Sequence, residues 1–473
     1  MYYWINNILF AVYVLIIFSC IVVVLRENRN PIRSLAWVIA LIFLPVVGFI
    51  FYLFFGRSLK GIHMLTRHGK RKLLHNYPRR RVDLAEMGLD PGENSIVRLA
   101  DKLCSGRLTV NNNIEIFTDG PSKFESLKQD LLAARESILF QYYIFLDDKA
   151  GNEIADILIA KARQGVRVKV IYDHVGSFSA SNKFFKRMQA GGVDTHPFFR
   201  VTFPQLANRI NWRNHRKIVV IDGAIGYIGG MNIADRYISG LKDGAVWRDT
   251  HFRVTGDIVQ SLIFSFVIDW NFLKKEHDLL DIQAKPSPYC NKTGIQLVTS
   301  GPVNEWDNLT LVFLKAIGNA RKSIYIQTPY FLPTDALLQA LQAASLAGID
   351  VRIMMPGECD SKMLQYASNS YVTACLKAGI KIYRYNPGML HAKMMTVDED
   401  FVTAGSTNFD FRSFENNFEC NLLVYDRDFN RAMRDIYFAD MAQCRKLTLT
   451  DWRSRPLFHR LMESLVRLVS PIL

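Results

Sequence analysis

Cysteine is scarce in this chain, and its few copies are not arranged as a metal site. Seven cysteines are spread over 473 residues, and no two of them form a Cys-x-x-Cys pair. Neither zinc-ligand spacing nor the even cysteine set of a disulfide framework is present. We therefore expect the cysteines to be small, buried apolar residues in a reducing compartment.

Acidic residues are also in the minority. The chain has 44 Asp and Glu against 58 Lys and Arg, which gives a net charge of +14. Its partners should therefore be anionic, and nucleic acid and a phospholipid surface are the two obvious candidates. The hydrophobic content of 49% is high for a soluble enzyme, and the excess lies mainly at the N-terminus. That location favours the phospholipid surface.

The N-terminus has no basic segment before its first apolar stretch and no small-x-small cleavage site, so we expect an uncleaved anchor. Ile5 to Leu25 spans 21 almost wholly apolar residues. At about 1.5 Å per residue they reach roughly 30 Å, the thickness of the hydrocarbon core. Leu35 to Phe55 predicts a second membrane helix. It contains Pro45 and Gly48, which leave a kinked span and a re-entrant hairpin open.

Basic residues flank these two stretches unequally. The positive-inside rule therefore places the large C-terminal region in the cytoplasm. The cluster at 57–81 reads either as a surface for anionic headgroups or as a simple topology determinant. Arg26, Arg29 and Arg33 lie between the stretches, with only Glu27 opposing, and nine basic residues follow the second stretch: Arg57, Lys60, Arg67, Lys70, Arg71, Lys72, Arg79, Arg80 and Arg81.

The remaining chain predicts an α/β fold that occurs twice. A strand, an amphipathic helix and a second strand recur in the same order with a period near 180 residues. Each half predicts a mixed sheet with helices on both faces. We expect a membrane hairpin over 1–57, a basic linker with a short helical entry over 58–108, α/β halves over 109–285 and 286–450, and an amphipathic helix over 451–473.

The repeated segments are similar in sequence as well as in order. Ala134-Arg135-Glu136-Ser137-Ile138 corresponds to Ala320-Arg321-Lys322-Ser323-Ile324, Gln141-Tyr142-Tyr143 to Gln327-Thr328-Pro329-Tyr330, and Gly165-Val166-Arg167-Val168 to Gly348-Ile349-Asp350-Val351.

One short pattern also occurs twice, 176 positions apart. In both copies four residues separate Lys from Asp, and six separate Asp from the following Gly. Agreement at six of seven fixed positions with identical spacing predicts one site assembled from two similar half-domains. The first copy is His215-x-Lys217, Asp222 and Gly229-Gly230-x-Asn232, and the second is His391-x-Lys393, Asp398 and Gly405-Ser406-x-Asn408.

These residue types suit phosphodiester chemistry. Each His-x-Lys opens an apolar run, and positions i and i+2 of a strand point to one face. If the halves meet about a pseudo-two-fold axis, two histidines and two lysines converge. Two lysines supply positive charge around the phosphate oxygens. One neutral imidazole can attack phosphorus, and the other, protonated, can give its proton to the leaving alcohol.

Other polar residues of the pattern have supporting roles in this hypothesis. Asn232, Ser406 and Asn408 can donate hydrogen bonds to the phosphate. Asp249 and Glu419, which occupy comparable places before the last strand of each half, are the candidates to orient the second ring nitrogen of a histidine.

Asp222 and Asp398 belong to the same catalytic pattern. We nevertheless favour a structural role for both, pinning a turn or pairing with a buried basic group. Tyr143 and Tyr330 are expected in the core or the pocket wall.

The last residues predict a helix with two contrasting sides. It could rest in a membrane interface or pack on the core, and the sequence leaves both open. One side carries Arg453, Arg460 and Arg467, and the other carries Phe458, Leu461, Met462, Leu465, Val466 and Val469.

The duplicated pattern resembles the signature of the phospholipase D superfamily, and the full length resembles its bacterial cardiolipin synthases. The N-terminal hairpin with Asn30-Pro31, the run Gln327 to Pro333 and the closing segment Arg455 to Leu473 contribute to this resemblance. It implies a multi-pass protein of the bacterial inner membrane. It also implies transfer of a phosphatidyl group from one phosphatidylglycerol to another, without metal or other cofactor, with His215 as nucleophile and His391 as general acid.

The motifs leave other activities open. Attack of a histidine on phosphorus gives a phosphohistidine, and either water or an alcohol can then react with it. A hydrolytic phospholipase or another phosphatidyltransferase is therefore an alternative. A membrane-anchored nuclease fits less well, because it has less use for two apolar segments and an amphipathic C-terminus, and no nucleic-acid partner is expected. Two complete motifs argue against a lipid-binding scaffold without catalysis.

Overall fold

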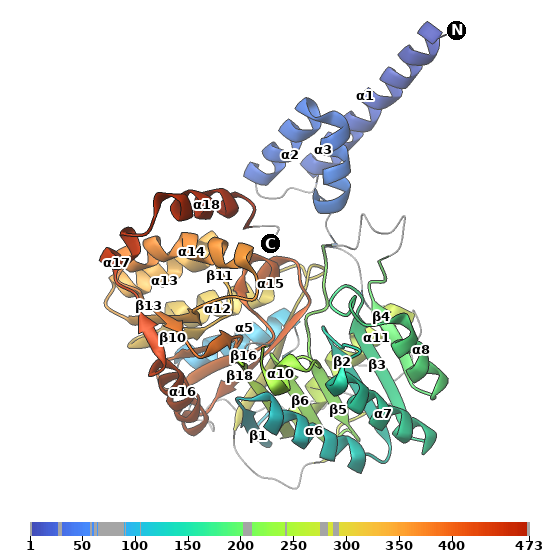
Figure 1. The fold of residues 1–473 in the computed structure, drawn as a ribbon, viewed down its shortest axis with the longest axis vertical. Helices are drawn as coiled ribbons and strands as arrows, with labels where there is room; N and C mark the ends of the chain where they lie inside the picture. The colour runs from blue at the N-terminus through green and yellow to red at the C-terminus, as the bar shows by residue number, and fades with distance from the viewer. Residues whose placement is uncertain are drawn as a thin grey trace. The chain divides into compact units, whose positions relative to one another are not determined.

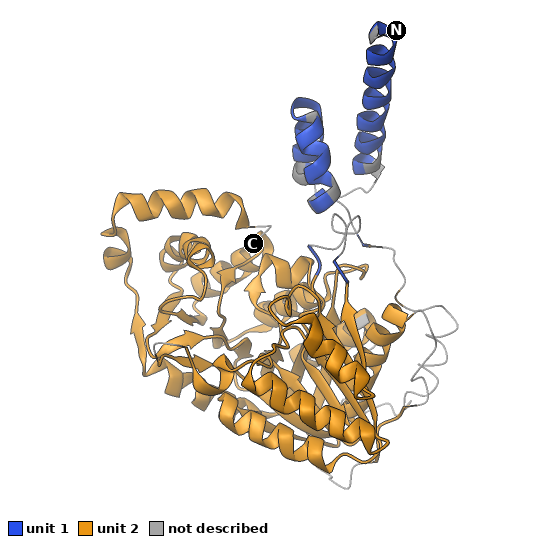
Figure 2. Cartoon of the chain, turned by 45° about the vertical axis from the view of Figure 1, so that its right-hand side comes forward, with its two compact units in different colours: residues 1–59, 200–212 blue, residues 60–199, 213–473 orange. Residues whose placement is uncertain are grey.

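A computed structural model describes residues 2–26, 31–56, 59–60, 64, 89, 91–104, 106–201, 211–241, 244–274, 282–286 and 293–470. The chain forms two compact units, residues 1–59 with 200–212 and residues 60–199 with 213–473 (Figure 2). Most of the predicted basic cluster at 57–81, and Glu27 and Arg29 of the connector, lie outside the described residues.

The smaller unit begins with one long apolar helix, α1 (Tyr2–Arg26). Its stretch Tyr3–Val22 has a mean hydropathy of 2.4 over 20 residues and is long and apolar enough to cross a membrane. By length and composition, α1 therefore matches the first predicted span.

The second apolar stretch is not one helix, and whether it spans a membrane stays a prediction. It consists of α2 (Pro31–Phe43), α3 (Pro45–Phe51) and a π-helical turn, η1 (Tyr52–Gly56). A Cβ added to Gly48 would lie 2.4 Å from the carbonyl oxygen of Ala40, so α3 bends back against α2 where only glycine fits. The 13 residues of α2 reach about 20 Å, less than a hydrocarbon core. Of the alternatives left open, a kinked or re-entrant segment fits.

The first α/β half of the larger unit is built on a mixed seven-stranded sheet (Figure 1). β2, β3 and β4 pair in parallel, and the other neighbours pair antiparallel. In sheet order its strands are β1 (Asn112–Phe117), β8 (His251–Gly256), β6 (Ile225–Gly229), β5 (Ile218–Ile221), β2 (Ser137–Tyr142), β3 (Arg167–Asp173) and β4 (Asp194–Phe198). Its main helices are α6 (Gly120–Ala133), α7 (Lys149–Arg163), α8 (Asn182–Ala190) and α11 (Ile258–Lys274).

The second half repeats this order and adds one edge strand, β19, so the predicted duplication of an α/β unit is confirmed. Its strands in sheet order are β19 (Cys444–Lys446), β13 (Lys381–Tyr385), β12 (Asp350–Pro356), β10 (Ser323–Gln327), β15 (Met394–Val397), β16 (Phe401–Gly405), β18 (Glu419–Tyr425) and β9 (Gly294–Ser300). Its main helices are α12 (Asn308–Asn319), α13 (Asp335–Leu346), α14 (Lys362–Lys377) and α16 (Arg427–Met441).

Local sequence explains where corresponding helices begin and end. The side chain of Asp148 caps α7, and that of Thr334 caps α13, each accepting from a backbone N–H of the first turn. Gly165 and Gly348 then adopt positive φ values of 90° and 96°, two positions before β3 and β12 begin. Glycine tolerates this left-handed conformation, which lets the chain leave the helix for the sheet.

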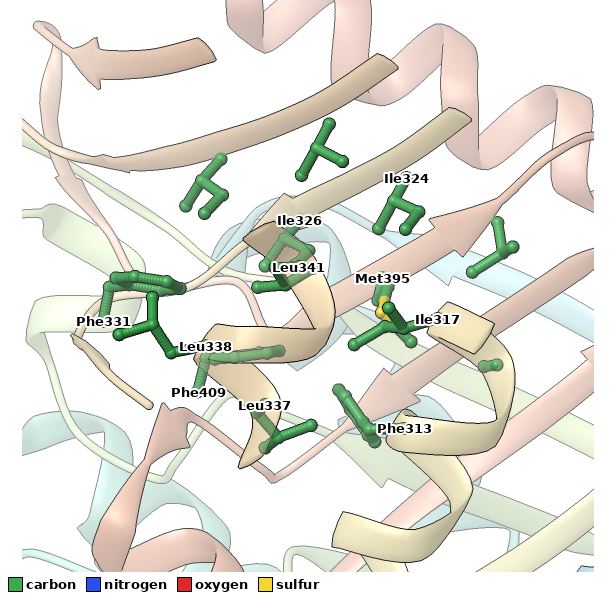
Figure 3. Packing of buried hydrophobic residues seen from close by; sticks show 14 of the residues in the cluster. Phe313, Ile317, Ile324, Ile326, Phe331, Leu337, Leu338, Leu341, Met395 and Phe409 are labelled. Carbon is green, nitrogen blue, oxygen red and sulfur yellow. The ribbon is translucent and has the colours of Figure 1, made fainter. Parts of the chain in front are cut away.

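Each half buries its own hydrophobic core. In the second half, Figure 3 shows side chains of α12 and α13 meeting those of β10 and β15, among them Phe313, Leu341, Ile326 and Met395. The core of the first half includes Met389, which belongs to the second half by sequence. The two halves are therefore interlocked in one packed unit.

Short elements complete the larger unit. α5 lies within the segment predicted as a linker and packs on β9 and α12. The short elements are α5 (Pro91–Cys104), α10 (Arg236–Ser239), α15 (Phe411–Glu415), α17 (Leu449–Arg453), α18 (Leu457–Leu468), the parallel pair β11 (Phe331–Leu332) and β17 (Phe409–Asp410), and the parallel pair β14 (Gly388–Leu390) and β7 (Val246–Arg248).

Candidate active site

The two His-x-Lys pairs lie at equivalent places, immediately before β5 and β15. All four side chains are buried in the larger unit. The Lys217 ammonium donates to the backbone oxygen of His215 at 2.6 Å, and Lys393 makes the same contact with His391. Each lysine is thereby held against the histidine two residues earlier, as expected of side chains on one strand face.

Each histidine is paired with the acid of the other half. His215 Nδ1 lies 2.9 and 3.0 Å from the two carboxylate oxygens of Glu419. His391 Nδ1 lies 2.6 Å from Asp249 Oδ2. The Lys393 ammonium lies 2.7 Å from the same Nδ1 of His391. In the tautomer whose Nδ1 donates to the carboxylate, Nε2 of each ring is left for a reacting group. The sequence named both acids as orienting candidates without saying which histidine each would serve.

Backbone pairing between the halves produces this exchange of partners. β14, which leads into His391, runs parallel to β7, which leads into Asp249. The amide of His391 donates to the oxygen of Arg248 at 2.6 Å, and the amide of His215 donates to the oxygen of Phe418 at 2.9 Å. Each histidine backbone therefore lies beside the residue that precedes the other half's acid.

Burial disfavours the protonated form of both imidazoles by lowering their pKa values. It lowers the pKa of His391 to about 4, and Lys393 adds to the effect against Asp249. It also lowers the pKa of His215, where Glu419 opposes the shift and Lys217 and Lys393 add to it. Neutral imidazole is the form that can act as a nucleophile.

The lysines and acids form one electrostatic cluster across the halves. Burial lowers the pKa of Lys217 to about 7, and Lys393 adds to that shift while Glu419 and Asp249 oppose it. Burial alone would raise the pKa of Asp249, but Lys393 and His391 hold it below its ordinary value. The two half-sites are thus close enough to act on each other's charges.

Two arginine–aspartate pairs, which the sequence analysis did not identify, hold the acids in place. Arg216 pairs with Asp269 at 2.7 Å, and its Nε donates to the backbone oxygen of Glu419 at 3.2 Å. Arg248 pairs with Asp440 at 2.9 Å and donates to the backbone oxygen of Asp249 at 2.7 Å. These contacts fix the strand ends that carry the acids.

A glutamine completes each of these pairs. Gln141 donates to Asp269 at 2.6 Å, and Gln327 donates to Asp440 at 2.8 Å. The two glutamines are equivalent positions of the internal repeat. Their recurrence was the one sequence signal that could have identified these supporting residues.

The last acidic positions of the two motifs, Asp222 and Asp398, pin turns instead of entering the cluster. Asp222 accepts backbone N–H bonds from residues 135, 136 and 137 at 2.7–2.9 Å. Asp398 accepts the equivalent three from residues 321, 322 and 323. Both residues have positive φ, 52° and 51°. These contacts favour the turn-pinning interpretation over the catalytic one.

The predicted phosphate-binding side chains contact protein groups in this structure. Asn232 accepts from the amide of Ile144 at 3.1 Å and donates to the hydroxyl of Tyr237 at 2.7 Å. The Ser406 hydroxyl donates to Glu419, and the Asn408 side chain hydrogen-bonds Asp410. A role of Asn232, Ser406 and Asn408 in binding phosphate stays a prediction.

Gly230 stands where the second motif has Ser406, and the space around it explains the difference. A Cβ on Gly230 would lie 2.1 Å from Asp249 Oδ1. In the second half the acid is one methylene longer, and Ser406 fits beside it. The size of the residue at this motif position therefore matches the length of the acid beside it, Gly230 with Asp249 and Ser406 with Glu419.

Aromatic rings form walls beside both histidines. Tyr143 meets His215 edge-on with ring centroids 4.7 Å apart, and Trp247 lies 5.2 Å from His391. Tyr330 lies 6.4 Å from His391. The expectation that Tyr143 and Tyr330 are core or wall residues agrees with these contacts.

No cluster in the described part of the chain has three His, Cys, Asp or Glu side chains placed to hold a metal ion. Whether the reaction needs a metal stays a prediction from the sequence.

Comparison with known proteins identifies the family of both halves and of the N-terminus. A family model described as "Cardiolipin synthase, PLD-like domain" matches residues 127–263 and 313–441. A second, described as "Phospholipase_D-nuclease N-terminal", matches residues 14–57.

Similar proteins cover nearly the whole chain. Cardiolipin synthase 2 of Bacillus anthracis is 40% identical over 463 residues, 95% of this chain and 89% of that protein. The major cardiolipin synthase ClsA of Bacillus subtilis is 37% identical over 99% of this chain and 100% of that protein. The crystal structure of a phosphatidylserine synthase from Haemophilus influenzae has the same fold, with a TM-score of 0.62, 17% identity, and coverage of 80% of this chain and 100% of that one.

Proposed function

The chain belongs to the cardiolipin synthase family, and we propose that it transfers the phosphatidyl group of one phosphatidylglycerol to a second. The products are cardiolipin and glycerol. The enzyme is a phosphatidyltransferase with a membrane-associated N-terminus, as its relatives and α1 indicate. One observation carries the proposal: two buried histidines, each paired with a carboxylate of the opposite half, share one cluster with two lysines.

In the first step, Nε2 of His215 attacks the phosphorus of the donor lipid. A bond forms between phosphorus and Nε2, and the bond between phosphorus and the oxygen of the headgroup glycerol breaks. His391 gives that oxygen a proton. Bringing the anionic phosphodiester into the cluster favours the protonated form of His391, which burial alone disfavours. Glu419 stabilises the positive charge that develops on His215.

In the second step, the terminal hydroxyl of another phosphatidylglycerol attacks the phosphohistidine. His391 takes the hydroxyl proton, the phosphorus–nitrogen bond breaks, and cardiolipin forms. One phosphodiester replaces another in the overall reaction, so the transfer is reversible. Lys217 and Lys393 balance the charge of the phosphate oxygens in both steps.

The test is to give the purified protein phosphatidylglycerol vesicles in the presence of a chelator. We expect cardiolipin and glycerol in equal amounts. Phosphatidic acid without cardiolipin would sink the synthase proposal in favour of a hydrolase. Cleavage of DNA or RNA in place of lipid would favour the nuclease.

The roles of the two histidines need a substrate that leaves without a proton. With a phosphatidyl p-nitrophenol ester, His391→Ala should release one equivalent of nitrophenol and accumulate phosphoenzyme, because the second step lacks its base. His215→Ala should form none. Phosphoenzyme in His215→Ala alone would reverse the assignment.

We also place the α/β halves on the cytoplasmic side, which rests on the unequal basic flanks of the apolar stretches. A protease added to sealed, right-side-out vesicles should leave the α/β halves intact. Their digestion without detergent would contradict this orientation.

A further inference from the structure

α18 turns its apolar side away from the protein. On its inner side, Glu463 is buried, and the guanidinium of Arg467 lies 4.6 Å from the ring of Tyr371 on α14. Figure 1 shows α18 running along α14, the helix on which it packs. The side chains that point outward are 51–79% exposed and are Leu457, Phe458, Leu461, Leu465 and Leu468.

This orientation is the reverse of a surface helix in water, whose apolar stripe faces the core. The inner contacts are specific. Arg455 forms a bidentate pair with Glu463 at 2.5 and 3.0 Å, and it stacks 3.2 Å from the ring of Trp452. Glu463 thus fixes the inner side of α18 to the protein, and five large apolar side chains are presented outward. An apolar medium bordered by polar groups satisfies such a helix, as the interface of a lipid leaflet does.

A cavity of about 990 Å³ lies beneath the C-terminal helices. Its size is at the upper end of the range of small-molecule sites, about 300–1,000 Å³. Arg455 and His459 line it from the C-terminal helices, and Met389 from the segment that leads into His391. Leu241 and Ala245 of the first half line it as well.

The cavity is lined by four basic side chains, Lys362, Arg384, Arg445 and Arg455, and by three carboxylates, Glu358, Asp360 and Glu463. Arg384 lines the wall, is 5% exposed, and donates to the oxygens of Pro356 at 3.0 Å and of Asn369. In the described residues, no carboxylate lies within ion-pair distance of Arg384 or of its exposed neighbour in the wall, Arg445. A buried, unpaired guanidinium is costly unless an anion joins it.

The wall of the cavity reaches the surroundings of His391. Asp360 lines the cavity and accepts from the Tyr330 hydroxyl at 2.7 Å, and the Tyr330 ring lies 6.4 Å from His391. Asp360 is close enough to His391 to act on the pKa of its ring. Asp360 and Tyr330 thus connect the cavity wall to the surroundings of His391.

We propose that this cavity holds the phosphodiester headgroup of the acceptor phospholipid, and that α18 lays its outward side chains in the leaflet that carries this lipid. Arg384 and Arg445 bind the acceptor's phosphate, and its terminal hydroxyl extends toward His391. The inference rests on the proposed transfer between two lipids and identifies where the second lipid binds.

Two rates measured on the same vesicles test the cavity. Exchange of labelled glycerol into phosphatidylglycerol needs the donor site alone, whereas cardiolipin formation also needs the acceptor lipid. In Arg384→Gln the ratio of cardiolipin formation to exchange should fall about 10-fold or more, the scale of a lost charge-assisted hydrogen bond. Arg445→Gln should lower it less. Arg431→Gln, which changes an exposed arginine of α16 that pairs with Asp428, should not change it.

The outcomes separate this inference from the proposed function. An unchanged ratio in folded Arg384→Gln, or two rates that fall in parallel, would overturn the acceptor site. If Arg384→Gln does not fold, the exposed Arg445→Gln decides by the same ratio. Inhibition by inorganic phosphate that these variants abolish, with the ratio intact, would assign the cavity to a free anion. Absence of both reactions in the parent protein would instead refute the proposed function.

The leaflet contact has its own readout. The double variant Leu461→Ser with Leu465→Ser should lower the rate on phosphatidylglycerol vesicles relative to the rate on a short-chain phosphatidylglycerol dissolved in detergent. Leu346→Ser changes a still more exposed leucine, at the end of α13, and should leave this relative rate unchanged. An unchanged relative rate in the double variant would refute the leaflet contact.

Discussion

Carboxylates of different length serve the two histidines, and each requires its own neighbour. Asp249 reaches His391 only because Gly230 leaves it room, whereas Glu419 reaches His215 and also accepts from Ser406. Both halves thus place a carboxylate beside a histidine, one with Gly230 and Asp249 and the other with Ser406 and Glu419. Replacing one residue of a pair by its counterpart in the other pair should disturb one histidine.

Gly230→Ser should lower cardiolipin formation at least 10-fold, the usual effect of losing a supporting contact of this kind. Its Cβ would displace the Asp249 carboxylate and leave His391 without its partner. Steady-state assays on lipid vesicles measure the loss. Gly318→Ser is the control, since nothing lies within 4 Å of a Cβ at that helical position. Normal activity in Gly230→Ser would contradict the steric argument.

The burial of His391 also predicts how stability depends on pH. Its pKa is about 4 in the folded chain, against about 6.5 in an unfolded one. Between these pH values the unfolded state binds more protons than the folded state. The contribution of His391 to the free energy of unfolding is therefore fully present above about pH 6.5 and is lost as the pH falls toward 4. Melting temperatures measured in detergent should decline over this window.

The contribution of this one group can be isolated by replacement. In His391→Asn the decline between about pH 6.5 and pH 4 should be shallower than in the parent protein. His459→Asn, which changes an exposed histidine of α18, provides the comparison. Equal slopes in His391→Asn and the parent would show that the ring is not protonated on unfolding in this range.

At the level of elements, the turns after β5 and β15 have the same geometry in both halves of the chain. Each places an aspartate at positive φ against three backbone N–H groups at the start of a neighbouring strand. The motif spacing of four residues between Lys and Asp is the length of these strands. The aspartate therefore follows the last residue of the strand, and the histidine lies before its first residue.

Asp222→Ala should reduce stability by about 1–2 kcal/mol, because three backbone donors lose a charged acceptor that is partly open to solvent. For the larger unit that is a fall in melting temperature of about 1–2.5 °C. Activity per folded molecule should be retained. Asp428→Ala removes an exposed aspartate and is the control. Unchanged stability with activity lost by about 100-fold or more would return Asp222 to the chemistry.

The sequence predicted the main strands and helices because their signals are local. Alternating and continuous apolar runs, capping residues and the repeated Gly165 and Gly348 are all read within a few positions. β7 and β14 could not be predicted in this way, since three-residue strands exist only because each finds the other across the halves. Pro45 and Gly48 marked the second apolar stretch as bent, and the chain does divide there into α2 and α3, but hydropathy alone could not choose between a kinked span and a re-entrant hairpin.

At the level of the whole molecule, one site draws on both halves of one chain. The sequence predicted this from the duplication, and both histidines and both lysines lie in the predicted cluster. It could not predict which acid serves which histidine, because the partners are 204 and 142 positions apart. It also could not predict Asp269 and Asp440, which lie on helices without a recognisable motif.

Mixing two inactive variants should therefore not restore activity. His215→Ala and His391→Ala each lose one required histidine, and the intact histidine of one chain cannot join the site of another. Co-reconstitution of the two proteins in phosphatidylglycerol vesicles measures this, with parent protein diluted by either variant as the reference. Recovery toward a quarter or more of the parent rate would mean that sites form between chains.

The exchange of acids between the halves constrains how the two copies can diverge. A substitution at Asp249 acts on the histidine of the later copy, and one at Glu419 acts on that of the earlier copy. The environment of the histidine in each copy therefore depends on an acid that belongs to the other copy. The duplicated halves therefore evolve as one unit, and a circular permutation between them should be tolerated more readily than replacement of one half by a duplicate of its sibling.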